Sequence, residues 1–380
     1  MGREKVGGQM KPIYLDNAAS TPVRPRVLAK FAEIADSLYG NPSSKHIEGI
    51  NAYEEVSHTK DKIAEFLSCA SDEIYFTSGA TMSNNILIQG MFRKHPETML
   101  IISNVEHNDI MELYNWLPYT KRIVPVNKSG IIDLAILDNL INECKETGRY
   151  SLVSVQLANS ETGIIQPVRE ISEIVHKHDK AFFHSDATQY IPYYPVNMDE
   201  MGIDALSMSG QKINGLKGSG ILALRRDMQE HVAPIIFGEQ GLIGGTPATP
   251  LISSLGVAFE EINYNVTELQ HKRDVLLDYL IHIGGVLVGT KNNRLPNNIY
   301  IRFPGISGLS LVNLLNDYQI SIGTGSACST DSDRPSHVAM AYGLTPEEAL
   351  ECVRFTLSNS ITYEEIEYVA KVVKTLISLV

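Results

Sequence analysis

The stretch VREISEIVHKHDKAFFHSDATQ, residues 168–189, indicates the fold class of this chain. Its first half, 168–178, has apolar residues at helical spacing, which predicts an amphipathic helix. Its second half contains KAFFHSDA (180–187), a short apolar run that predicts a buried strand. Apolar strands joined by helices are typical of a mostly parallel sheet that is covered on both faces.

The same alternation extends through the first 225 residues. Five further short, apolar runs are predicted strands: EIYF (73–76), MLIIS (99–103), SLVSVQLA (151–158), DALSMS (204–209) and GILALR (220–225). Amphipathic segments lie between several of them. We therefore predict an α/β fold, with a large domain over residues 15–255 in which helices sandwich a mostly parallel sheet.

The pattern changes from about residue 250. We expect helices at 266–283, 309–318, near 345–360 and at 363–380, and strands at 297–303 and 320–323. These elements predict a smaller α+β domain over residues 256–380, together with about residues 1–14.

Composition narrows the class of protein. The 380 residues are 43% hydrophobic and 20% charged, which is typical of a soluble globular protein. A formal net charge of -12 without a Lys/Arg run argues against a nucleic-acid surface. There is no apolar run of about 18 residues, no signal-peptide core at the start, and no CxxC among the four cysteines. We expect a cytoplasmic protein with no membrane segment and no metal site.

A candidate phosphate site follows the first predicted strand. TSGATMSNN (77–85) joins that strand to a predicted helix through a glycine turn with small hydroxyl residues. Free backbone N–H groups and the helix dipole favour an anion there, and phosphate is the natural occupant. The alternative is that Ser78 or Thr81 merely caps the helix.

Two further polar residues lie at the ends of predicted strands. Asp186 needs a cation or hydrogen bonds, which a protonated ring nitrogen of a cofactor or an ordinary ion pair would supply. Lys212, followed by glycines, is either a solvated lysine or one that forms a Schiff base. A phosphate loop, then an acid, then a lysine is the order that pyridoxal 5'-phosphate requires.

The chain resembles the class V, fold-type I pyridoxal-phosphate enzymes, specifically cysteine desulfurases of the NifS/IscS type. The resemblance runs from residue 14 to the C-terminus. Its motifs, beyond TSGATMSNN and HSDATQ, are YLDNAASTP (14–22), GNPSS (40–44), EH (106–107), ETGIIQP (161–167), SGQK (209–212), LPNNIYIRFPG (295–305), GSAC (325–328), RPSHV (334–338) and VRFTLS (353–358).

This resemblance implies roles for individual residues. Lys212 would form the Schiff base, Asp186 would pair with the pyridine nitrogen, and His107 would stack on the ring and move protons. The other implied cofactor contacts are Ala80, Thr81, Ser160, Gln189, Ser209, Gln211 and Thr246, the last across a homodimer interface. Arg354, assisted by Asn41, would clamp the substrate carboxylate. The alternatives are a structural core histidine at 107 and a surface salt bridge at 354.

At four positions the residue differs from the one that the family usually has. Gln211 replaces a histidine, Ser160 the second asparagine of NNExG, Ile243 an arginine and Met82 a glutamate. The residues that would form covalent bonds, Lys212 and Cys328, are present. We therefore interpret the chain as a divergent member of the family.

Cys328 lies in GTGSACSTDSDRPSH (323–337), which offers a thiol few apolar partners. The resemblance implies that its thiolate takes sulfur from L-cysteine, leaving L-alanine and a persulfide. The acceptor of that sulfur would be an iron–sulfur scaffold or a tRNA-thiolation protein. The polar stretch predicts a mobile tether, whereas Cys352 is predicted to lie in the core on a helix face.

Two alternatives stay open from the residues. One is another class V reaction, by an aminotransferase or a lyase acting on selenocysteine or cysteine sulfinate, although these need no such nucleophile. The other is a degenerate, non-catalytic member of the family. The residues also leave open the identity of the sulfur acceptor and the preference between cysteine and selenocysteine.

Overall fold

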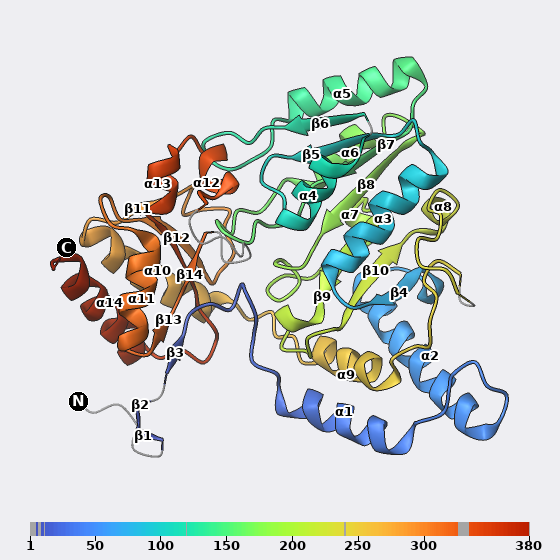
Figure 1. Cartoon of the computed structure of the whole chain (residues 1–380), viewed down its shortest axis with the longest axis horizontal. Coiled ribbons are helices and arrows are strands. Elements are labelled where there is room, and N and C mark those ends of the chain that lie inside the picture. Colours follow the sequence, from blue (N-terminus) through green and yellow to red (C-terminus); the bar gives the residue numbers. More distant parts are fainter. Residues whose placement is uncertain are drawn as a thin grey trace.

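A seven-stranded sheet forms the centre of the larger part of the molecule (Figure 1), in the order β4-β10-β9-β8-β7-β5-β6. Its strands are β4 (Ile74–Thr77), β5 (Met99–Ser103), β6 (Lys121–Val124), β7 (Ser151–Ser154), β8 (Ala181–Asp186), β9 (Ala205–Ser209) and β10 (Gly220–Leu224). The neighbours from β6 to β9 run parallel, and β10 is antiparallel to both β9 and β4. The predicted fold class is confirmed.

This computed structural model describes residues 5–6, 9–10, 12–118, 120–238, 241–325 and 334–379. Cys328 and the prediction of a mobile tether around it lie outside the described residues. Within the described ranges, no helix combines the length and apolar character needed to cross a membrane.

Alternation along the central strands explains why both faces of the sheet are covered. Val153 and Phe183 belong to one buried cluster, whereas their neighbours Leu152 and Phe182 belong to another. The first cluster is closed by α2 (Ile47–Leu67), α5 (Leu134–Thr147), α6 (Val168–Val175), α7 (Met198–Met201) and α9 (Thr249–Glu260), with α1 (Pro25–Ser37) against α9. The second is closed by α3 (Ala80–Lys94), α4 (Asn108–Trp116) and α8 (Arg226–Gln229).

A four-stranded antiparallel sheet, in the order β11-β12-β15-β14, forms the smaller part. Its strands are β11 (Val286–Leu287), β12 (Asn298–Arg302), β14 (Gly323–Thr324) and β15 (Cys352–Thr356). Residues of α10 (Thr267–His282), α11 (Gly308–Asp317) and α14 (Tyr363–Ile377) share a separate core with this sheet. The N-terminal strand β3 (Ile13–Tyr14) joins that core by pairing with β13 (Ile320–Ser321), and Figure 1 shows it beside the orange and red helices.

The remaining elements are short. They are the strand pair β1 (Lys5–Val6) and β2 (Gln9–Met10), the helices α12 (His337–Ala341) and α13 (Pro346–Leu350), and two 3-10 turns, Ser71–Glu73 and Gly210–Lys212.

Three predicted elements are corrected by the structure. The helix expected near 345–360 is wrong, because α13 ends at Leu350 and β15 follows, where the β-forming sequence CVRFT pairs residue by residue with β12. Cys352 is buried as predicted, but on this strand. The strand expected at 320–323 divides into β13 and β14, which belong to different sheets, and β7 ends at Ser154, before the predicted boundary.

Side chains alternate between the two faces of β15, and this alternation turns Arg354 towards the larger part of the molecule. Val353 and Phe355 lie in the core of the smaller part, whereas Cys352 and Tyr300 belong to the core of the larger part. Because side chains alternate along a strand, Arg354 shares the side of Cys352. A strand of the smaller part therefore presents a cation to the larger part.

Truncation of the central sheet tests this account of the core. Ile101→Ala in β5 removes a fully buried side chain and is expected to lower the free energy of unfolding by about 2–5 kcal/mol. Ile281→Ala in α10, where the side chain is 45% exposed, is the matched control and should cost no more than about 0.5 kcal/mol. Urea unfolding followed by circular dichroism measures both. Equal losses for the two variants would contradict the assignment of the core.

Candidate active site

A tight turn between β4 and α3 builds the predicted phosphate site. Gly79 has a φ of +148°, which side chains disfavour, and α3 begins at Ala80. The Ala80 backbone N–H donates to Oγ of Ser209 at 2.8 Å, so the end of β9 is fixed to the start of α3. A Cβ on Gly220 would lie 2.5 Å from Cα of Gly79, so glycine at that position lets β10 pass the turn. Since the first N–H groups of a helix lack acceptors within it, this turn suits an anion.

Asp186 ends β8 in a buried position near this turn. The Thr188 backbone N–H donates to its Oδ1 at 2.9 Å, and Nδ2 of Asn84, on α3, lies 3.3 Å from its Oδ2. Burial, and then the negative charge of Asp109, raise the pKa of Asp186, so a cation beside it would stabilise the carboxylate. Among the described residues, the buried Oδ1 of Asn84 has no hydrogen-bond partner. The Thr188 side chain bonds to Asp186 and lowers its pKa in part. This polar, incompletely paired environment fits a ring nitrogen that carries a proton.

His107 is connected to Asp186 through two residues that the sequence analysis missed. Its Nδ1 lies 2.7 Å from Oδ1 of Asp109, whose side chain is 8% exposed. Nδ2 of Asn84 donates to Oδ2 of Asp109 at 3.1 Å and also contacts Asp186. Burial alone would raise the pKa of Asp109, but bonds from His107, Asn84 and Thr81 and the charge of His107 lower it. His107 therefore faces a carboxylate that is held in its ionised form.

Lys212 lies in the 3-10 turn after β9. Its Nζ donates to the carbonyl oxygens of Ala18 at 2.6 Å and Ala19 at 2.5 Å. Nε2 of Gln189 donates to the same Ala18 oxygen at 3.0 Å, and the Ala18 N–H donates to Oγ1 of Thr356 at 2.9 Å. The segment around Ala18 thus connects β15 of the smaller part to Lys212.

Arg354 is buried, which excludes a surface salt bridge. Its Nη1 donates to the carbonyl oxygen of Ser160 at 2.9 Å, and its Nη2 lies 2.8 Å from Oδ1 of Asp16. Its buried Nε has no hydrogen-bond acceptor among the described residues. Gly323, upstream of Cys328, pairs directly with Arg354 between β14 and β15. The chain therefore enters the segment containing Cys328 beside a buried cation.

Glu161 contacts the chain on both sides of the segment that contains Cys328. Its Oε2 accepts a bond from Oγ of Ser336 at 2.6 Å, and a Cβ on Gly325 would lie 2.7 Å from the same oxygen. A side chain at position 325 would also overlap the hydroxyl of Tyr300. Burial raises the pKa of Glu161 to about 7, despite the lowering effect of the bond from Ser336 and the charge of Arg354. The motif ETGIIQP contains this glutamate, but its letters do not indicate these contacts.

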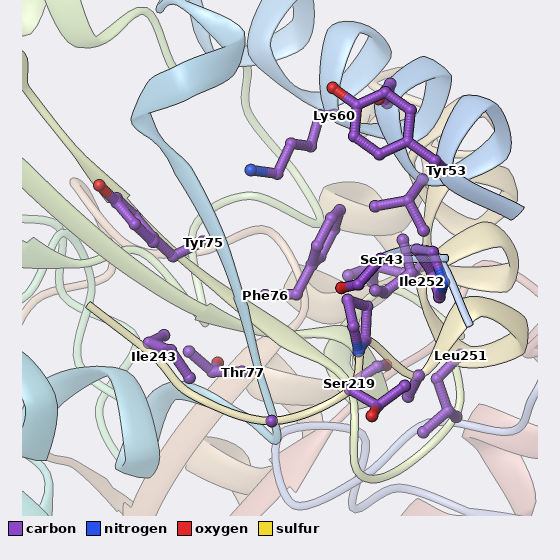
Figure 2. Close-up of a pocket in the computed structure, with 18 of the residues that line it drawn as sticks. Ser43, Tyr53, Lys60, Tyr75, Phe76, Thr77, Ser219, Ile243, Leu251 and Ile252 are labelled. Atoms are coloured by element: carbon purple, nitrogen blue, oxygen red, sulfur yellow. The ribbon is translucent and has the colours of Figure 1, made fainter. Parts of the chain in front are cut away.

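Asn41 and Thr246 lie apart from this cluster, and both are exposed. Thr246 lines a cavity of about 790 Å³ whose walls come from α2, β4 and α9, as Figure 2 shows. This cavity reaches Thr77 at the phosphate turn, but none of Lys212, Asp186 and His107 lines it. The Oδ1 of Asn41 accepts a bond from the backbone of its own turn.

The four departures from the family pattern are accommodated in two ways. Ser160 and Gln211 contribute backbone carbonyl oxygens, which accept bonds from Arg354 and from the 14–22 segment respectively. Asn159 does not replace the missing asparagine, because its side chain is buried and holds its own turn. Met82 and Ile243 pack against the same apolar cluster.

Comparison with known proteins places the chain in a family. Residues 13–369 match Aminotransferase class-V, and the chain belongs to this family. It is 36% identical to the cysteine desulfurase IscS of Rickettsia typhi, over 95% of this chain and 90% of that protein. It is 34% identical to the probable mitochondrial cysteine desulfurase of Dictyostelium discoideum, over 97% of this chain and 84% of that protein. A solved structure of a NifS-like protein superposes with a TM-score of 0.89 at 30% identity, covering 97% of this chain and 100% of the other.

Glu106, beside His107, is a further buried acid. Its carboxylate accepts bonds from the Gln156 backbone N–H, at 3.1 Å to Oε2, and from the Ser103 hydroxyl. Burial raises the pKa of Glu106 from 4.5 to about 8. Because the folded state binds this proton more tightly, the stabilisation is complete below pH 4.5 and is lost as the pH rises through about 8.

Glu106→Gln is therefore expected to reduce the pH dependence of stability. The free energy of unfolding of the wild type should fall between pH 5.5 and 9, as Glu106 loses its proton. In Glu106→Gln this fall should be smaller by at least about 1 kcal/mol. The control is Glu347→Gln, because the pKa of exposed Glu347 is lowered and that group stays ionised throughout this range. Urea unfolding at several pH values measures the slopes. An unchanged slope in Glu106→Gln would contradict a protonated Glu106.

Proposed function

We propose that this chain is a pyridoxal-phosphate-dependent cysteine desulfurase, which converts L-cysteine to L-alanine and keeps the sulfur as a persulfide on Cys328. One observation supports this most strongly: Arg354, beside the chain that leads to Cys328, bonds to Asp16, and two residues later the carbonyl oxygen of Ala18 accepts a bond from Lys212. The relatives named cysteine desulfurase support the same reaction.

The residues present fit the cofactor. Pyridoxal phosphate, when bound, supplies an aldehyde and a ring that accepts negative charge from the substrate. The amine of Lys212 would hold the aldehyde, and Asp186 would hold the proton on the ring nitrogen. Gln189 would contact the ring hydroxyl. The phosphate would be held by the start of α3 with Ser209, with the side chains of Thr81 and Gln211 and the backbone of Ala80 nearby. Ser160, whose carbonyl oxygen accepts a bond from Arg354, would contact the cofactor or the substrate. The unpaired buried Oδ1 of Asn84, beside Asp186, supports this fit.

Separate residues of this chain would bind the substrate, move protons and accept the sulfur. The guanidinium of Arg354 suits the substrate carboxylate, because its planar fork binds both oxygens. Asn41 lies apart from Arg354 within one chain, so its proposed assistance would come from a second copy of this chain. Lys212 and His107 would move protons at the substrate Cα and thiol. The Cys328 thiolate would attack the substrate sulfur, forming an S–S bond as the C–S bond breaks. The electron pair of the broken bond stays on carbon and is protonated, so cysteine and one thiol give alanine and one persulfide.

The proposed partners are a sulfur-acceptor protein and a second copy of this chain, in the cytoplasm. Exposed apolar side chains lie on and before α2, at Tyr39, Ile47 and Tyr53. Tyr53 and Thr246 line the same cavity, which reaches the phosphate turn. This arrangement supports a homodimer in which Thr246 contacts the cofactor phosphate of the partner.

Product analysis tests the reaction. Wild-type protein supplied with pyridoxal phosphate, L-cysteine and a reductant should release alanine and sulfide in equal amounts. Cys328→Ala and Lys212→Ala should each lower the rate by more than about 100-fold, since each removes a group that forms a covalent bond. Cys69→Ser, which changes a thiol with no proposed role, is the control.

The outcomes separate the alternatives. Alanine formation that survives in Cys328→Ala would contradict the persulfide and favour another class V reaction. Absence of both products from the wild type, with cofactor bound, would leave a non-catalytic protein.

Sedimentation velocity tests the dimer. The wild type is expected to sediment at twice the chain mass of 42.0 kDa, and Tyr53→Lys should shift it towards the monomer because a charge is costly in an apolar interface. Tyr279→Lys, on α10, changes another exposed tyrosine and should have no effect. A monomeric wild type over the whole concentration range would contradict this proposal.

A further inference from the structure

We propose that Asp109 is a positioning residue, which fixes the His107 imidazole with its proton on Nδ1 so that Nε2 exchanges protons during the reaction. This inference rests on the proposed function for the role of His107, but its geometric basis is independent of the reaction. It assigns a role to a residue that no motif in the sequence indicated.

The contact between the two residues fixes the tautomer. Oδ1 of Asp109 and Nδ1 of His107 are 2.7 Å apart, which is a short, charge-assisted hydrogen-bond distance. An ionised carboxylate only accepts hydrogen bonds, so the proton must be on Nδ1. The Asp109 backbone N–H is 3.4 Å from the same nitrogen, too far to compete with the carboxylate. A neutral imidazole held in this way has its lone pair on Nε2.

Asp109 is itself held in place from several directions. Its Oδ1 accepts a second bond from the Ile110 backbone N–H at 2.8 Å, and its Oδ2 accepts the bond from Asn84 at 3.1 Å. It lies in the first turn of α4, where the helix dipole favours a carboxylate. These contacts keep the carboxylate ionised and leave it little freedom to turn away from His107.

Local backbone geometry brings the pair together. His107 is the N-cap of α4, with φ −61° and ψ 151°, and Asp109 follows two residues later inside the first turn. The extended N-cap lets the imidazole fold back over the start of its own helix. The pair is therefore built into the protein and does not depend on a bound ligand.

Asn84 extends the effect of Asp109 to Asp186. The single Nδ2 group of Asn84 lies within bonding distance of both carboxylates, at 3.1 Å and 3.3 Å. The same amide therefore orients two carboxylates: Asp109, which contacts the proposed proton carrier His107, and Asp186, the proposed partner of the ring nitrogen. This explains why a buried asparagine stands between two acids.

A double-mutant cycle tests the proposal in the complete enzyme. Asp109→Asn keeps the shape of the side chain but removes its charge, so kcat for alanine formation should fall by at least about tenfold while KM for cysteine stays within about twofold. His107→Asn keeps an N-capping residue and should lower kcat further. If Asp109 acts through His107, the double variant should be no slower than His107→Asn.

Asp133→Asn is the matched control. Asp133 caps α5 by accepting bonds from two backbone N–H groups, and its variant should keep the wild-type kcat. Independent, multiplicative losses in the double variant would overturn the proposal, as would a normal kcat in Asp109→Asn.

A second measurement does not depend on turnover. The ¹⁵N signals of the His107 ring, identified by their loss in His107→Asn, should show a proton on Nδ1 in the wild type and a changed tautomer distribution in Asp109→Asn. A wild-type ring protonated on Nε2 alone would overturn the inference. If the wild type forms no alanine, the proposed function fails, and the ring signals alone decide the role of Asp109.

Discussion

The backbone of residues 16–19, held between β15 and Lys212, is the constraint on which the site depends. On one side, Thr356 donates its N–H to the Leu15 carbonyl, and its Oγ1 accepts from the N–H of Ala18. On the other side, the carbonyl oxygens of Ala18 and Ala19 accept bonds from Lys212. An N-terminal segment thus joins a C-terminal strand to the lysine. Because residues 15–19 take part through their backbone, their position depends little on their own side chains, although it does depend on Thr356 and Lys212.

Buried ionisable groups are a second feature of the candidate site. Glu106, Glu161, Asp186 and Arg354 are all buried, and charge or hydrogen bonds compensate each of them only in part. Such burial costs stability unless the groups are paired. The raised pKa values of the three acids show this cost directly. A cofactor and a substrate with complementary charges would offset it, which is a physical reason for placing these groups together.

Two of the four departures from the family pattern lie at positions where the backbone makes the contact. Ser160 and Gln211 interact through carbonyl oxygens, which any side chain would leave available. Met82 and Ile243, where the family usually has a glutamate and an arginine, both pack against one apolar cluster, so neither position places a charge against it. This pattern supports a divergent member of the family and gives no structural reason for a loss of its binding groups.

Short windows of the sequence predict the alternation of strands and helices, the smaller C-terminal part, and the order of phosphate turn, Asp186 and Lys212. These features are local: periodicity over 168–189 and the residue after each strand are visible in short windows. The strand β15 is not predicted, because five residues in an apolar stretch do not show whether they will pair with β12, at least 50 positions earlier.

The roles of Asp109, Asn84 and Glu161 were decided only by the tertiary structure. Asn84 contacts Asp186 across 102 positions, and Glu161 contacts Ser336 across 175. Asp109 is only two residues from His107, but Asn84, which holds its carboxylate, is 25 positions away. The physical reason is that hydrogen bonds and charges act over a few ångströms in space, whatever the separation along the chain. The sequence places chemical groups on elements, and the packing of those elements decides which groups meet.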